Sequence, residues 1–176
     1  IKPALKITDN IYGGPVFSYE WTLGKDFQSP TALINEHKRT SMLNFGAFLT
    51  YDSRDVSYNA YKGIYMSVEQ DNYINFGDMP MFRTICDFRY YKQVWNNAVM
   101  ALRGYGSFSY GKVPWTMVIW DNGAIPLRSY SEGRYGDDNL LSVMVELRQR
   151  VWKRLGFVVW VGAGNFYSKE DPFCWK

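Results

Sequence analysis

The sequence of 176 residues has little of the side-chain chemistry that most active sites use. It contains one histidine, His37, and two cysteines, Cys86 and Cys174, which form no CxxC-type pair. This spacing argues against the usual zinc and redox motifs, and His37, in a polar stretch, is expected to be a solvated loop residue. Both cysteines are expected to be packed thiols, although spacing does not determine whether they pair. Without a G-x-S-x-G elbow or a phosphate-binding loop, the sequence predicts no enzyme, no cofactor and no metal site.

The sequence also lacks a strong charge of one sign and any long apolar run. Lys and Arg total 20, Asp and Glu total 17, and no block of like charges occurs, so no nucleic-acid partner is expected. No run of about 18 apolar residues is present, which excludes a transmembrane helix but not a membrane β-barrel, whose strands alternate. The aromatic content of 18% excludes a disordered chain.

Apolar and polar residues alternate almost throughout, which is the pattern of β-strands. In residues 141–152, for example, Val143 and Val145 alternate with Met144, Glu146 and Arg148. Strands are expected at 12–22, 43–52, 63–73, 81–94, 98–110, 141–152 and 155–166, with a weaker one at 2–8. The predicted fold class is therefore all-β and antiparallel, with seven or eight long strands.

The expected connections alternate in length. Residues 95–97 and 153–154 are short links, whereas 24–40 and 111–139 are long. Short turns at one end and long loops at the other are typical of outer-membrane barrels, in which the short turns face the periplasm. The connection 53–62 is longer than this scheme expects.

The alternation gives one apolar face and one face that carries charges such as Asp87, Arg103 and Glu146. A soluble sandwich would bury the apolar face, whereas a membrane barrel would turn it toward lipid. Periodicity alone does not separate the two, but strand length, aromatic content and loop asymmetry favour the barrel. The alternative is a small self-contained β-barrel or soluble β domain with a ligand-binding or scaffold role.

Three stretches resemble the BamA/TamA type of outer-membrane protein, the bacterial surface antigen superfamily. Residues 49–55, LTYDSRD, followed by Lys62-Gly63, are similar to its D-x-R-D segment. Residues 127–135, LRSYSEGRY, resemble its V/L-R-G-F/Y signature loop, with Ser129 in place of the glycine. Glu146-Leu147-Arg148 resembles its E-Y-R strand, and Gly162 stands where the family has an acid.

The resemblance covers roughly residues 43–167 and implies the second half of a sixteen-stranded, up-and-down transmembrane barrel. Residues 1–176 would then be a single barrel domain and a fragment of a longer barrel. The implied role is non-enzymatic: assistance in the insertion, assembly or translocation of outer-membrane proteins in the bacterial outer membrane. The implied partners are the lipid bilayer, substrate outer-membrane proteins, and periplasmic POTRA domains or accessory lipoproteins outside this chain.

The resemblance also implies site residues. The signature loop, 111–139, is expected to enter the lumen, with loop residues and lumen partners Arg128, Ser129, Tyr130, Gly133, Arg134, Glu146 and Arg148. Because an unpaired Arg128 in the lumen would be costly, a bidentate pair with Glu146 is expected to anchor the loop. Alternatively, Arg128 is solvated and Glu146 pairs with Arg148 or Arg103.

A second set, Asp52, Arg54 and Asp55, is expected to form a structural motif at the periplasmic rim. A strand-end turn stabilised by side chain–backbone hydrogen bonds explains the same residues equally well.

Overall fold

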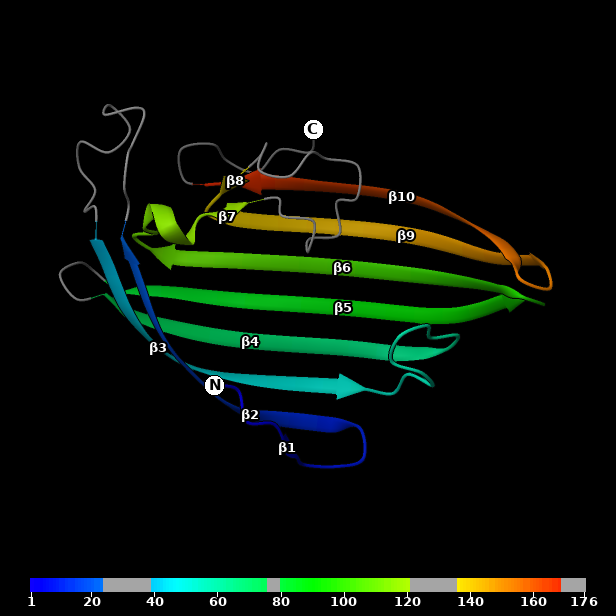
Figure 1. Cartoon of the computed structure of the whole chain (residues 1–176), viewed down its shortest axis with the longest axis horizontal. Helices are drawn as coiled ribbons and strands as arrows, with labels where there is room; N and C mark the ends of the chain where they lie inside the picture. Colours follow the sequence, from blue (N-terminus) through cyan, green and yellow to red (C-terminus); the bar gives the residue numbers. More distant parts are fainter. Residues whose placement is uncertain (24–38, 76–79, 121–135, 169–176) are drawn as a thin grey trace.

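The computed structural model describes residues 1–23, 39–75, 80–120 and 136–168. An eight-stranded antiparallel sheet dominates these residues, and its spatial order follows the sequence. The strands are β1 (Leu5–Lys6), β2 (Ile11–Leu23), β3 (Arg39–Asp52), β4 (Gly63–Asn75), β5 (Met81–Trp95), β6 (Ala98–Gly111), β9 (Asn139–Trp152) and β10 (Leu155–Tyr167). The expected all-β, up-and-down fold is confirmed, and the sheet forms an open curved trough (Figure 1). No helix among the described residues is long and apolar enough to cross a membrane.

The strands are long. Apart from β1, each contains 13 to 15 residues. A strand in a globular protein usually has about 5–6 residues, whereas a tilted strand that crosses a bilayer needs about 9–11. The observed lengths therefore suit a membrane-spanning sheet. The expected boundaries agree closely with the observed ones for most strands. The exceptions are β3, which begins at Arg39 rather than at residue 43, and the weaker strand expected at 2–8, which is only the two-residue β1.

The short connections gather at one end of the sheet (Figure 1). Residues 96–97 join β5 to β6 and residues 153–154 join β9 to β10. Asn97 and Lys153 have positive φ angles of 62° and 40°, the backbone conformation that tight turns between strands require. The connections 7–10 and 53–62 lie at the same end. The two-residue turns follow the predicted asymmetry, whereas 53–62 does not, because it is longer than the connection 76–80 at the opposite end.

The two faces of the sheet are inverted relative to a soluble protein. Val143 and Val145 point outward from β9 and are 39% and 37% exposed, whereas Ser142 and Glu146, which flank them in the sequence, are 0% and 3% exposed. Other outward side chains of the same kind are Phe45, Leu49, Met66, Val68, Phe82, Phe88, Phe157 and Val159. Because no described layer covers this apolar face, the soluble-sandwich alternative does not fit, and the barrel arrangement does.

The segment between β6 and β9 differs in part from the sequence expectation of a stretch without strands. Its described ends contain a 3-10 turn, Trp115–Met117, and a short ladder between β7 (Ile119–Trp120) and β8 (Gly136–Asp137). Met117 packs with Met42, Tyr73 and Met81 in a buried apolar cluster. This cluster fills the concave side of the trough near the end opposite the short turns.

Candidate functional site

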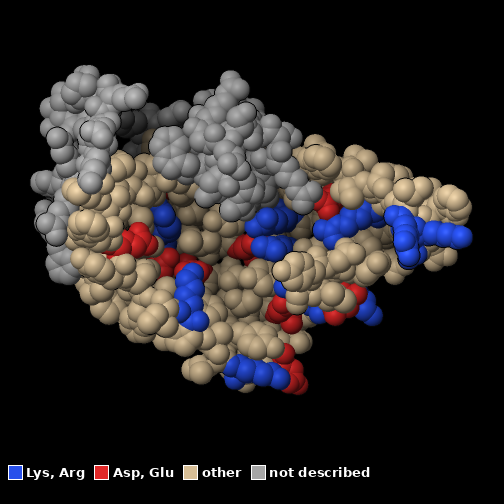
Figure 2. Space-filling model, viewed as in Figure 1, with Lys and Arg blue, Asp and Glu red and all other residues tan. Residues whose placement is uncertain are grey.

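Charged side chains gather on the concave face, where Figure 2 shows a hollow lined by basic and acidic groups. Asp87 of β5 accepts hydrogen bonds from two guanidinium groups at once. Arg89 donates from Nη2 over 2.5 Å and from Nε over 3.0 Å, and Arg103 of β6 donates from Nη2 over 3.0 Å. The strand alternation places these side chains on one face, so opposite charges meet along β5 and across to β6.

Glu146 and Arg148 form an ion pair on the same face of β9, with Arg148 Nε as the donor to Glu146 Oε1. Glu146 is buried, whereas the Arg148 side chain is 28% exposed. Arg148 Nη1 also donates to Asn59 Oδ1 over 3.0 Å, and its guanidinium lies 5.7 Å from the Tyr91 ring centroid. The Glu146–Arg148 contact named in one of the two expected alternatives is therefore present, whereas Arg128 lies outside the described residues.

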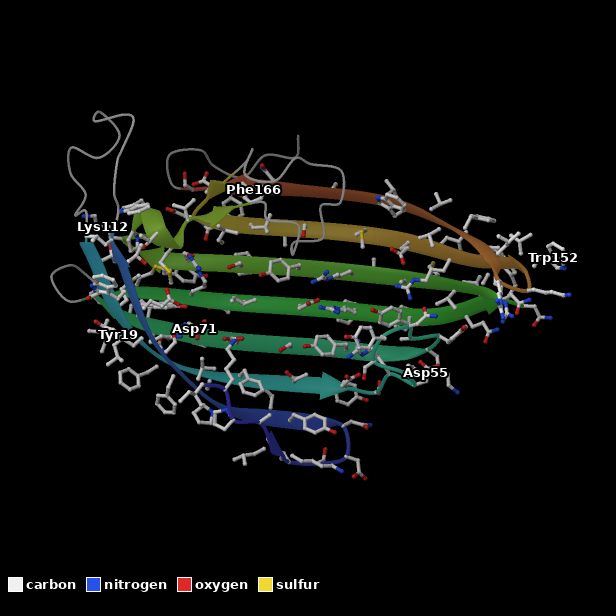
Figure 3. The ribbon with its side chains drawn as sticks, viewed as in Figure 1. Tyr19, Asp55, Asp71, Lys112, Trp152 and Phe166 are labelled. Carbon is white, nitrogen blue, oxygen red and sulfur yellow. The ribbon has the colours of Figure 1, made fainter. Side chains whose placement is uncertain are left out.

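Asp52, Arg54 and Asp55 organise the connection 53–62, which we call the rim loop. Arg54 donates to Asp52 from Nε over 2.8 Å and from Nη2 over 2.7 Å. Asp55 Oδ1 accepts the backbone N–H groups of Val56, Tyr61 and Lys62. Desolvation opposes ionisation of Asp55, but these N–H donors hold the pKa of its carboxyl below the ordinary value. The motif is thus a turn built on side chain–backbone hydrogen bonds at the short-connection end (Figure 3).

Gly63, which follows the rim loop, is required for a steric reason. Gly63 has a φ of 116°, which side-chain-bearing residues rarely adopt. A Cβ at this position would lie 2.5 Å from the carbonyl oxygen of Ser53 and 2.6 Å from Arg54 Cα. The Lys62-Gly63 step therefore requires glycine, which explains this part of the motif.

The rim loop folds inward over the sheet. Asn59 reaches Arg148 on β9, although β4, β5 and β6 separate β3 from β9 in the sheet. Ala60 is buried, with 2% of its surface exposed. The ring of Tyr65, at the start of β4, stacks against two guanidinium groups, whose central carbons lie 4.7 Å (Arg54) and 5.0 Å (Arg89) from the ring centroid. The loop is longer than a simple turn because it crosses the concave face at the short-connection end.

Replacement of Asn59 by leucine should loosen the rim loop, because it removes the hydrogen bond to Arg148. We expect a loss of about 1 kcal/mol in the free energy of unfolding and faster proteolysis within residues 53–62. The measurement is limited proteolysis of the full-length protein in detergent. Tyr58→Ala is the control, because the Tyr58 side chain is fully exposed and should change stability by no more than about 0.5 kcal/mol. Equal cleavage rates for the two variants would show that the contact does not hold the loop.

The base of the signature loop is held against the concave face. Arg83 of β5 donates from Nη2 to the carbonyl oxygen of Met117 over 2.5 Å and from Nε to Ser109 Oγ over 3.1 Å. The guanidinium thus joins the 3-10 turn to β5 and β6. The loop residues Arg128, Ser129, Tyr130, Gly133 and Arg134 lie outside the described residues, as do His37 and Cys174, while Cys86 is a free thiol.

The contacts of five site residues were not predicted from the sequence: Asn59, Tyr65, Arg83, Arg89 and Tyr91. The strand alternation places Tyr65, Arg83 and Arg89 on the charged face, but it does not identify their partners. Asn59 lies in a loop, which has no periodicity from which its contacts can be inferred. Among the described residues, no group of three or more His, Cys, Asp and Glu side chains is placed to hold a metal ion.

Comparison with known proteins gives one match. A family model described as the Omp85 superfamily domain matches residues 9–176, which is nearly the whole chain. No curated protein and no solved structure matches the sequence.

Proposed function

This chain belongs to the Omp85 superfamily, and we propose that it is part of a non-enzymatic barrel of the BamA/TamA type that assists the insertion, assembly or translocation of outer-membrane proteins. At the coarse level, the superfamily is one of outer-membrane proteins that insert or translocate other proteins. The proposed partners are the lipid bilayer, unfolded outer-membrane proteins, and periplasmic POTRA domains or accessory lipoproteins on other segments or chains.

The observation that carries the proposal is the inverted sheet. An apolar outer face, with Val68, Val145 and Val159 between 37% and 57% exposed, suits contact with lipid. The charged concave face suits a polar lumen, where Asp87, Arg89 and Arg103 satisfy one another. A protein that inserts other barrels needs an outer face that lipid can cover and a polar interior, and the two faces of this sheet support that role.

Within this function, we assign Arg128 the role of anchoring the signature loop to Glu146. Glu146 is the acidic side chain buried on the concave face of β9, and its Oε1 accepts from Arg148 Nε. A carboxylate has acceptor sites for a second guanidinium, as the two arginines at Asp87 demonstrate. Gly162 of β10, which pairs with Met144 of β9, stands where the family has an acidic residue. Because glycine carries no charge, Glu146 would anchor Arg128 without a second acid.

Depletion of the full-length protein from its native cells tests the function. We expect lower levels of folded, heat-modifiable outer-membrane proteins, because folded barrels migrate differently from unfolded ones on gels. The protein itself should fractionate with the outer membrane and require detergent for extraction. Unchanged outer-membrane protein levels after depletion, or a protein that is monodisperse in plain buffer, would contradict the proposal.

Arg128→Ala tests the loop anchor. We expect complementation of the depleted cells to fall, while Lys112→Ala, at the exposed base of the same loop, should complement normally. A short thiol-reactive cross-linker should join cysteines placed at positions 129 and 144, which leave Arg128 and Glu146 intact, in a chain with Cys86 and Cys174 replaced by serine. Absence of that cross-link in the assembled protein, with a normal yield of folded chain, would remove the assignment.

A further inference from the structure

Two neighbouring turns form one surface at the short-connection end of the sheet. The β5–β6 turn and the β9–β10 turn lie together beyond the rim loop in Figure 1, and Trp152 marks the second of them in Figure 3. The backbone N–H of Arg150 donates to the carbonyl of Asn97 over 2.8 Å. Trp95 Nε1 donates to Gln149 Oε1 over 2.7 Å. These two hydrogen bonds join the two turns. We call the surface that the turns form the basic tip, and it consists of Lys92, Trp95, Arg150, Trp152, Lys153 and Arg154.

The basic tip carries positive charge without acidic neighbours in the sequence. Residues 88–98 and 147–158 contain no Asp or Glu. The other two connections at this end differ, because Lys6 pairs with Asp9 over 2.9 Å and Arg54 pairs with Asp52 over 2.7 Å. The protein as a whole has a formal charge of only +3, so the basic tip is a local concentration of charge.

The same surface exposes large apolar side chains. Trp95 is 53% exposed, Trp152 is 64% exposed and Leu155 is 64% exposed. Val151 continues the outward row of Val143 and Val145 along β9, so the basic tip is continuous with the lipid-facing surface. Lys153 Nζ lies 5.8 Å from the Trp152 ring centroid, which keeps an ammonium group beside the indole.

We infer that the basic tip binds the headgroups of anionic phospholipids at the membrane surface. Tryptophan is favoured at the boundary between hydrocarbon and water, and Lys and Arg there reach phosphate groups. Both residue types lie on adjoining turns at the end of the apolar outer face, where headgroups would meet them if that face contacts the hydrocarbon. A soluble acidic partner would explain the charges but not the exposed Trp95, Trp152 and Leu155 beside them.

The test compares lipid retention by three forms of the full-length protein: wild type, Lys153→Gln/Arg154→Gln, and the control Lys6→Gln/Lys62→Gln. The control removes the same charge from the same end of the sheet but outside the basic tip. Native mass spectrometry of protein released from mixed micelles measures the apparent dissociation constants for phosphatidylglycerol and for neutral phosphatidylcholine. Each basic residue near an anionic surface contributes about fivefold in affinity, so the double variant should bind its tightest phosphatidylglycerol about 25-fold more weakly.

The control variant should match the wild type, and phosphatidylcholine binding should be the same in all three forms. Equal phosphatidylglycerol affinity in the tip variant and in the wild type would overturn the inference.

A photoreactive amino acid at position 155, used in cells, distinguishes contact with lipid from contact with protein. Adducts with phospholipid are expected, whereas a cross-link to an acidic protein as the main product would identify that protein as the occupant instead. Heat-modifiable gel mobility verifies that each variant is folded. Neither the lipid dissociation constants nor the photo-cross-links depend on assembly activity.

Discussion

Val68→Arg should lower the free energy of unfolding in a lipid bilayer by about 2–4 kcal/mol, because it places a guanidinium on the lipid face near the middle of the membrane. Val68 lies near the centre of β4 and is 45% exposed on the apolar side of the sheet. Urea titration of the full-length protein in phospholipid vesicles, followed by tryptophan fluorescence, measures the loss.

Ser67→Arg is the matched control, because the adjacent residue points to the other face of the same strand. Ser67 exchanges a hydrogen bond with Thr50 over 2.9 Å and lies opposite Asp87 in the ladder with β5. An arginine there would meet a carboxylate and a polar interior, so its cost should be about 1 kcal/mol, the value of the lost hydrogen bond. If the two substitutions cost the same, or if Ser67→Arg costs more, the assignment of the apolar face to lipid is wrong.

Glu146→Gln should cost about 3 kcal/mol, because it removes the carboxylate from Arg148 inside the trough and leaves that guanidinium without its acid. The remaining partners of Arg148, the Asn59 amide and the Tyr91 ring, are neutral. Equilibrium unfolding in vesicles again measures the effect.

A double-mutant cycle separates the pair from the rest of the site. Arg148→Gln alone leaves Glu146 buried without this arginine, and Glu146→Gln/Arg148→Gln removes both charges together. The double variant should therefore be less destabilised than the sum of the single variants by about 1–3 kcal/mol. Additive losses would show that the two side chains do not stabilise each other and that Glu146 acts through another contact.

The strand pattern was accessible from sequence for a local reason. Successive side chains of a strand point to opposite faces, so β4, β5, β6, β9 and β10 were visible as alternation of residue types. The positions of the tight turns followed in the same way, since Asn97 tolerates the positive φ that the β5–β6 turn requires.

The loops and their contacts were less accessible. The sequence indicated that residues 53–62 were too long for a turn, but not that Asn59 crosses the concave face to Arg148. Arg83 gave no sign that it would bind the carbonyl of Met117, because that contact joins residues 34 positions apart. Such contacts depend on the path of the backbone in space, and residue type alone does not encode it.

Two properties of this protein followed from the order of its residues: it is a sheet of long antiparallel strands, and the sheet has one apolar face and one charged face. Both follow from the two-residue repeat of a strand. Which face lies outside was seen only in the folded sheet. That choice depends on the direction in which the whole sheet curves and on what covers each side. Here Ser142 and Glu146 lie inside the curve while Val143 and Val145 lie outside it.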